Sequence, residues 1–240
     1  MSTRALFRED AYLREATANV TGITEEGGLI IDTSIFYPVG GGQPGDSGHI
    51  EWDGGRAAIS TTGKGPNDTV VLVPAEGSTL PTTGQTIMQH LDWERRYSLM
   101  RVHTALHLLS VAIPFGVTGG SISEGKGRLD FNMENPPEDK NAIARHLNEM
   151  IATDAMTYQS WITDAELDAQ PELVKTMTVQ PPRGSGRIRL IRIGDDQTTI
   201  DLQPCGGTHV ARLSEIGPVR IGKVEKKGRM NRRVYLHLDS

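Results

Sequence analysis

The chain has 240 residues, of which 37% are hydrophobic and 23% are charged, and this composition is typical of a globular protein with one large domain or two small ones. The net charge of −5 argues against a protein that coats nucleic acid along its length, because such proteins neutralise many phosphates with Lys and Arg. With a single cysteine, no signal region and no stretch near the ~20 apolar residues that span a bilayer, we expect a cytoplasmic protein without disulfides.

The first part of the chain contains short strand patterns separated by turn residues. The expected strands are 17–24, 29–34, 48–52, 56–61, 69–73 and 86–91. Residues 74–84, rich in Gly, Pro and Thr, indicate an exposed loop. We therefore predict a small antiparallel, barrel-like N-terminal domain over residues 1–91.

At Asp92 the pattern changes from strands to helices. Asp92 can cap a helix over 93–112, which Pro114 stops, and a second helix is expected over about 137–153. Strands return at 187–193, 198–203, 219–224 and 233–238, after a connection at Pro181-Pro182-Arg183-Gly184. We predict an α+β protein with its second domain over 92–240.

Two motifs carry side chains that bind metal ions. His103 and His107 are four residues apart in the expected helix, so both imidazoles leave the same face. Cys205 and His209 flank Gly206 and Gly207, which leave the backbone free to turn so that thiolate and imidazole can converge. The spacing of the two histidines alone is weak evidence, and the Cys205–His209 motif is more specific. Together they predict a metal site, with zinc as the first candidate because it prefers tetrahedral N and S ligands.

The number of ligands leaves the role of the metal open. Four protein ligands are typical of a closed structural zinc site, whereas hydrolytic zinc keeps one position for water. Either one ligand is displaced, or the metal positions the substrate while another group activates water. The remaining histidines lie away from both motifs, and we assign them structural or solvent roles: His49, His90, His146 and His237.

The C-terminal thirty residues are basic, unlike the rest of the chain. They contain eight basic residues against three acidic ones. Such a run is most often a solvated face, and an RNA-binding surface is the alternative. The basic residues are Arg212, Arg220, Lys223, Lys226, Lys227, Arg229, Arg232 and Arg233.

At these motifs the chain resembles the editing domain of alanyl-tRNA synthetases. The resemblance rests on the His-x-x-x-His pair of 101–109, on Cys-Gly-Gly-Thr-His-Val at 205–210, and on Phe-Tyr-Pro-Val-Gly-Gly-Gly-Gln at 36–43. The segment Ser214-Glu215-Ile216-Gly217-Pro218 agrees as well. Because strands begin near residue 17, the chain looks like the free-standing AlaX trans-editing proteins, in a shorter form without the extra C-terminal domain.

The resemblance implies a fold, a reaction and a set of residues. The fold is an editing core of the threonyl/alanyl-tRNA synthetase type, and the enzyme is a zinc-dependent aminoacyl-tRNA deacylase. Its substrate is tRNA(Ala) mischarged with serine, and possibly glycine, because a synthetic site for alanine excludes these amino acids poorly. The implied metal ligands are His103, His107, Cys205 and His209.

The same resemblance assigns the pocket and the RNA surface. Gln43 and Ser34 are the expected readers of the serine hydroxyl, and Ser34 stands where the family usually has threonine. The other pocket residues are Gly41, Gly42 and Thr208. The acceptor stem is expected on the basic residues Arg187, Arg189, Lys223, Lys226, Lys227, Arg232 and Arg233.

Three alternatives compete with this hypothesis, one of which is an acquired role on a different tRNA. A non-catalytic RNA-binding module stabilised by a closed zinc site would use the same ligands and the same basic surface. A zinc peptidase is disfavoured, because Thr104, Ala105 and Leu106 occupy the positions where the His-Glu-x-x-His motif carries its catalytic glutamate.

Overall fold

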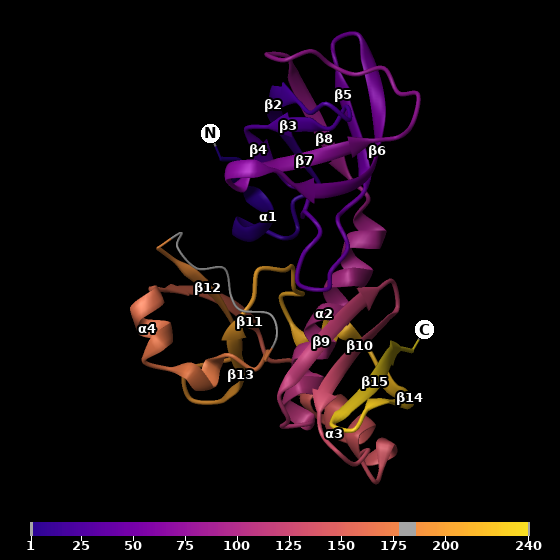
Figure 1. Cartoon of the computed structure of the whole chain (residues 1–240), viewed down its shortest axis with the longest axis vertical. Coiled ribbons are helices and arrows are strands. Elements are labelled where there is room, and N and C mark those ends of the chain that lie inside the picture. Colours follow the sequence, from indigo (N-terminus) through magenta and orange to yellow (C-terminus); the bar gives the residue numbers. More distant parts are fainter. Residues whose placement is uncertain (1, 178–185, 240) are drawn as a thin grey trace. The chain divides into compact units, whose positions relative to one another are not determined.

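The computed structural model describes residues 2–177 and 186–239, so the predicted connection at Pro181–Gly184 lies outside the described residues. The chain divides into two compact units, Met1–Tyr97 and Ser98–Ser240 (Figure 1). The division falls inside a helix, and domains bounded at residue 92 stay a prediction. None of the described helices has the length and apolar character that crossing a membrane requires.

The first unit is a closed barrel of six antiparallel strands, as the sequence predicts (Figure 1). Around the barrel the strands are β2 (Glu15–Ile23), β3 (Leu29–Ile31), β7 (Val70–Pro74), β6 (Gly55–Lys64), β5 (Gly48–Trp52) and β8 (Thr86–Leu91). Alternate residues of these strands point inward, so Ile31, Ile50 and Leu72 are buried in its core.

Short elements accompany the barrel. β1 (Arg4–Ala5) pairs in parallel with β4 (Thr33–Ser34), and the remaining elements are α1 (Leu6–Glu9) and the 3₁₀ helix η1 (Pro66–Asp68). The barrel also requires small residues where the chain doubles back. A Cβ on Gly45 would lie 2.1 Å from the carbonyl oxygen of Thr62, so only glycine allows this approach.

The second unit contains two sheets, which confirms the α+β class. One sheet has the order β14 (Val219–Gly228), β15 (Asn231–Leu238), β10 (Lys126–Asn132) and β9 (Val117–Ser123). The other has the order β11 (Thr157–Ile162), β12 (Ile188–Gly194) and β13 (Thr199–Pro204). Besides the long helix within which the two units divide, the helical elements among the described residues of this unit are α3 (Lys140–Ala152), α4 (Asp164–Asp168), η2 (Pro171–Leu173) and η3 (Leu213–Ile216).

Helix α2 (Trp93–Ala112) has the predicted bounds because its start and stop signals are local. Asp92 begins it, with its carboxylate 3.4 Å from the backbone nitrogen of Arg95 and its carbonyl accepting the first helical hydrogen bond from Arg96. α3 begins later than the predicted residue 137, because Asp139 is the residue whose side chain accepts hydrogen bonds from the backbone of Asn141 and Ala142.

Strands β9, β10 and β11 are absent from the sequence-based prediction. β9 and β10 contain glycines, which weaken any strand pattern, but Gly127 has a packing reason. A Cβ there would lie 2.7 Å from Val102 and 2.9 Å from Leu106, so glycine lets α2 pack directly on β10. The contact with α2 therefore explains the glycine at position 127, although glycine has a low propensity for strands.

Candidate metal centre

The four predicted ligands converge in the second unit. Their ligand atoms all lie within 4.8 Å of one another, and the three histidines are at most 7% exposed. Cys205 Sγ lies 3.4 Å from His103 Nε2 and 3.3 Å from His209 Nε2. A tetrahedral zinc with bonds of about 2.05 Å to nitrogen and 2.3 Å to sulfur would separate such a pair by about 3.6 Å. The donor set therefore fits a single tetrahedral zinc ion.

Two elements deliver these ligands. His103 and His107 lie one turn apart on α2, with ring centroids 5.3 Å apart. Cys205 follows the end of β13, and the Gly-Gly turn brings the His209 ring to 4.2 Å from the His103 ring. Helix α2 therefore positions His103 and His107, and the turn after β13 positions Cys205 and His209.

A carboxylate orients His107 from behind. Asp201 Oδ2 lies 2.8 Å from His107 Nδ1, and Gln203 Nε2 donates to the same carboxylate oxygen at 2.8 Å. The other oxygen of Asp201 accepts from Lys175. A carboxylate at Nδ1 holds the proton there and turns the Nε2 lone pair toward the cluster, as metal-bound histidines require.

Thr104 does the same for His209. Its hydroxyl donates to the Met100 carbonyl at 3.0 Å and accepts from the Val210 backbone N–H at 3.2 Å. Because its only proton is used, the hydroxyl accepts from His209 Nδ1, which lies 3.2 Å away. The Nε2 lone pair of His209 is thereby directed at the position where the four ligands meet.

The electrostatics of the cluster favour a thiolate. Burial raises the pKa of the Cys205 thiol, but the neighbouring His103 and His209 outweigh it and hold that pKa well below its usual range. Burial likewise raises the pKa of Asp201, which hydrogen bonding to His107 and the charge of Lys175 nevertheless lower to about 2. An anionic sulfur and an ionised supporting carboxylate are the forms that a bound cation needs.

Arg189 holds the loop that carries Cys205. Its guanidinium is buried and donates to the carbonyl oxygens of Cys205 and Gly207 at 3.1 and 2.8 Å and to Gln159 Oε1 at 2.9 Å. The structure does not support the prediction that Arg189 faces RNA, because its donors are used inside the protein. We assign it to positioning the Cys205 loop.

Replacing Asp201 by asparagine is expected to weaken zinc binding by about 10–100-fold, because a neutral amide polarises and orients His107 less well than a carboxylate. Competition with a chromophoric chelator measures this affinity. Asp196→Asn is the matched control, since Asp196 is exposed in the β12–β13 turn and pairs only with Arg192 among the contacts described. Equal zinc affinities of the two variants would contradict a supporting role for Asp201.

The predicted pocket loop belongs to the first unit. Gly41 and Gly42 have φ of +57° and +83°, as the central residues of a type I′ turn require. The turn is closed by hydrogen bonds in both directions between the backbones of Gly40 and Gln43, at 3.0 and 2.9 Å. The glycine run is thus a tight hairpin turn, and these two positions require glycine for their backbone conformation.

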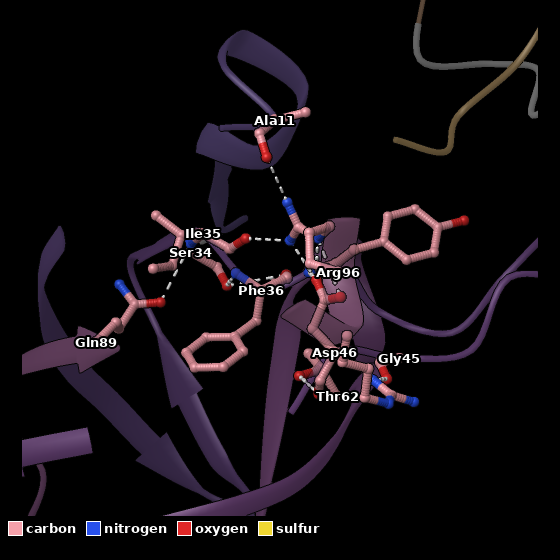
Figure 2. A network of polar contacts seen from close by, with 11 residues as sticks. Ala11, Ser34, Ile35, Phe36, Gly45, Asp46, Thr62, Gln89 and Arg96 are labelled. Carbon is pink, nitrogen blue, oxygen red and sulfur yellow. Dashed lines mark hydrogen bonds and ion pairs between the residues drawn. The ribbon is translucent and has the colours of Figure 1, made fainter. Parts of the chain in front are cut away.

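A buried ion pair anchors the base of the loop Ile35–Asp46 (Figure 2). The side chains of Arg96 and Asp46 are 0% and 1% exposed, and Arg96 Nε lies 3.0 and 2.9 Å from the two carboxylate oxygens. Arg96 also donates to the carbonyl oxygens of Ile35 at 2.7 Å and Ala11 at 3.0 Å. The guanidinium therefore joins three segments that are distant in the sequence.

The other expected pocket residues are buried. The Ser34 hydroxyl accepts from the backbone N–H of Phe36 at 3.0 Å and lies 3.1 Å from the Phe36 carbonyl oxygen, to which it donates. Gln43 and Thr208 are also buried, in the first and second units respectively. In this structure the Ser34 hydroxyl shapes the start of the loop Ile35–Asp46.

The predicted RNA-binding residues differ in exposure. Arg187, Lys223, Lys226 and Lys227 are exposed, and both Lys223 and Lys227 pair with Glu225. Arg233 is partly buried and is bound to Asp130 at 2.8 Å.

Arg232, in contrast, is a buried structural residue. It is only 6% exposed and donates to the backbone carbonyls of Gly228, Asn231 and Glu134. The prediction that Arg232 faces RNA is therefore not supported, because these carbonyls occupy its guanidinium.

Several supporting residues were not identified from the sequence. Asp201 and Gln203 precede Cys205 by four and two residues and share one face of β13, and this alternation of polar residues beside a ligand could have indicated them. Thr104 follows a ligand directly and carries no such pattern. Arg96 and Asp46 are fifty residues apart, and their pairing is visible only in three dimensions.

The comparisons with known proteins agree with this geometry. Residues 188–235 match the family model described as threonyl and alanyl tRNA synthetase second additional domain, and residues 4–95 match that of tRNA synthetases class II (A). An alanine–tRNA ligase of Pyrobaculum calidifontis is 33% identical over 93% of this chain, but the match covers only 25% of that ligase. This chain thus spans about a quarter of the length of such ligases.

Smaller relatives match along nearly their whole length. The alanyl-tRNA editing protein AlaX-M of Methanosarcina mazei is 30% identical over 98% of this chain and 96% of its own. The AlaX-M protein of Saccharolobus solfataricus is 32% identical over 97% and 98%. The resemblance read from the motifs is confirmed: the chain belongs to the AlaX-M family of alanyl-tRNA editing proteins.

Proposed function

We propose that this protein hydrolyses the ester that joins serine, or glycine as a further substrate, to the terminal ribose of tRNA(Ala). The observation that carries the proposal is the buried cluster of His103, His107, Cys205 and His209 in a chain of the AlaX-M family. The reaction would take place in the cytoplasm, where tRNA is charged and used.

The cluster is suited to hold zinc beside the reacting ester. When bound, zinc supplies a Lewis acid that polarises a carbonyl or a water molecule. The protein supplies orientation: Asp201 and Thr104 keep the Nδ1 protons of His107 and His209 on the outer side of the rings. Arg189 holds the Cys205 loop by its carbonyls, so that the ligands are placed before substrate arrives.

Selection of serine over alanine is assigned to the loop Ile35–Asp46. A pocket that hydrogen-bonds the serine hydroxyl rejects alanine, because alanine leaves the polar groups of the pocket unpaired. We propose Gln43 as the group that reads the hydroxyl, with Gly41 and Gly42 setting the turn that presents it. In the second unit, we assign Thr208 a role beside the metal ligands Cys205 and His209. Ser34 would contribute by holding the Phe36 backbone.

The exposed basic residues are proposed to bind the acceptor stem. The side chains that can each approach a phosphate are those of Arg187, Lys223, Lys226 and Lys227. Arg233 on β15 adds positive charge beside the three lysines of β14. Such contacts position the RNA and do not read its sequence. The proposal excludes Arg189 and Arg232, whose guanidinium groups are bound inside the protein.

Release of the amino acid from Ser-tRNA(Ala) and Ala-tRNA(Ala) tests the proposal directly. We expect the zinc-loaded protein to release serine at least tenfold faster than alanine, and the Gln43→Ala variant to lose this preference. Binding of tRNA with both esters left intact would contradict the hydrolase. It would favour the alternative of a non-catalytic RNA-binding module in which zinc stabilises the fold.

A further inference from the structure

A second group of metal-binding side chains lies on the barrel, in the first unit. His49 on β5 and His90 on β8 occupy directly opposite positions of an antiparallel strand pair. Their rings are stacked, with centroids 4.5 Å apart and planes 11° from parallel. Glu51 lies two residues after His49 and therefore on the same face of β5.

The carboxylate of Glu51 reaches both rings. Its Oε1 lies 3.5 Å from His49 Nε2, and its Oε2 lies 3.6 Å from His90 Nε2. These separations are longer than a good hydrogen bond but close to the distance between neighbouring donors of a shared metal ion. One ligand atom from each of the three residues lies within 4.8 Å of the other two.

His90 has the features of a prepared ligand. Its Nδ1 lies 3.1 Å from the Glu15 carboxylate across the β2–β8 pair, which holds the proton on Nδ1. Its Nε2 is shielded from solvent and has no hydrogen-bond partner. Buried polar atoms without partners are rare, and this one lies 3.6 Å from Glu51 Oε2. Asp201 orients His107 in the first cluster in the same way.

The charges around the group permit a cation. Glu15 and Glu51 contribute two carboxylates, whereas Arg56 on β6 contributes one positive charge, 3.6 Å from Glu51. The side chains of His49 and His90 are 28% and 21% exposed, so an ion can enter from solvent.

We propose that His49, His90 and Glu51 form a second site for a divalent transition-metal ion, with Zn²⁺ as the first candidate and water completing the coordination. Two imidazoles and one carboxylate are a donor set that zinc commonly accepts. The ion would join β5 to β8 and so stabilise the barrel by binding only its folded form. This site does not depend on the proposed deacylase activity.

Cobalt titration of the untagged full chain tests the proposal, because Co²⁺ replaces Zn²⁺ and reports its ligands. Wild-type protein is expected to bind two equivalents, of which only one produces a thiolate-to-cobalt charge-transfer band. Cys205→Ala should bind one equivalent without the band. His90→Gln and Glu51→Gln should each bind one equivalent with the band retained. His146→Gln, which removes an exposed histidine of α3, is the matched control and should bind two.

The outcomes separate the two sites. If His90→Gln, His49→Gln and Glu51→Gln, each folded by circular dichroism, bind as many ions as the control, the barrel site does not exist. A wild-type protein that binds one ion, lost in Cys205→Ala, would also overturn the proposal while leaving the first cluster intact. Loss of the charge-transfer band in His90→Gln would contradict the independence of the two sites.

Discussion

Cys205→Ala is expected to abolish release of serine from Ser-tRNA(Ala), with a fall in kcat/KM of about a thousand-fold or more. The substitution removes the only sulfur ligand, and loss of metal chemistry worth several kcal/mol corresponds to such a factor. Zinc content after dialysis should fall together with activity. The measurement is single-turnover deacylation, followed with labelled serine on the tRNA.

The control for this prediction must separate lost chemistry from lost folding. Circular dichroism reports whether Cys205→Ala keeps its fold, and binding of the acylated tRNA reports whether the RNA surface is intact. His146→Ala should retain full activity, whereas His107→Ala should lose it, although both remove one histidine. Wild-type rates in folded, zinc-depleted Cys205→Ala would refute catalysis at the cluster.

Arg96→Met is expected to lower the free energy of unfolding of the barrel by about 3–5 kcal/mol, because it leaves the buried side chain of Asp46 without its charge partner. Urea denaturation measures the change. The chain has three tryptophans, and Trp161 is exposed in the second unit. In a Trp161→Phe background the fluorescence of Trp52 and Trp93 therefore reports on the first unit alone.

A double-mutant cycle assigns the loss to the ion pair. Adding Asp46→Asn to Arg96→Met removes the unpaired charge and should recover part of the lost stability. The remaining deficit would reflect the hydrogen bonds from Arg96 to Ile35 and Ala11. A single Arg96→Met variant that unfolds within about 1 kcal/mol of the wild type would show that the pair contributes little.

Local patterns in the sequence were sufficient for most of the elements. The bounds of β5, β8 and α2 agree with the prediction, because alternation, turn residues and the Asp92 cap act over a few neighbouring residues. β9 and β10 were not predicted because glycines weaken their strand pattern, and at Gly127 the glycine allows the contact with α2. The start of α3 lies later than predicted because the side chain of Asp139 caps the helix through the backbone N–H groups of Asn141 and Ala142.

The candidate metal ligands could also be predicted from local sequence patterns. Their spacing is local within each motif, so the sequence by itself was enough to predict the four candidate ligands, to put zinc first among the candidate ions and to find the resemblance to alanyl-tRNA editing domains. Only the tertiary structure decided what supports those ligands. Asp201, Thr104 and Arg189 reach the cluster from separate elements, and no spacing records such contacts.

The same distinction between local motifs and tertiary contacts applies to Arg189 and Arg232 and to the pair of His49 and His90. Composition placed Arg189 and Arg232 with the other basic residues, but folding directs their guanidinium groups at backbone carbonyls. His49 and His90 are separated by forty-one residues and face each other only because β5 pairs with β8. The sequence determined the local motifs and the family, and the fold decided which distant side chains meet, because register and burial arise only when the strands pair.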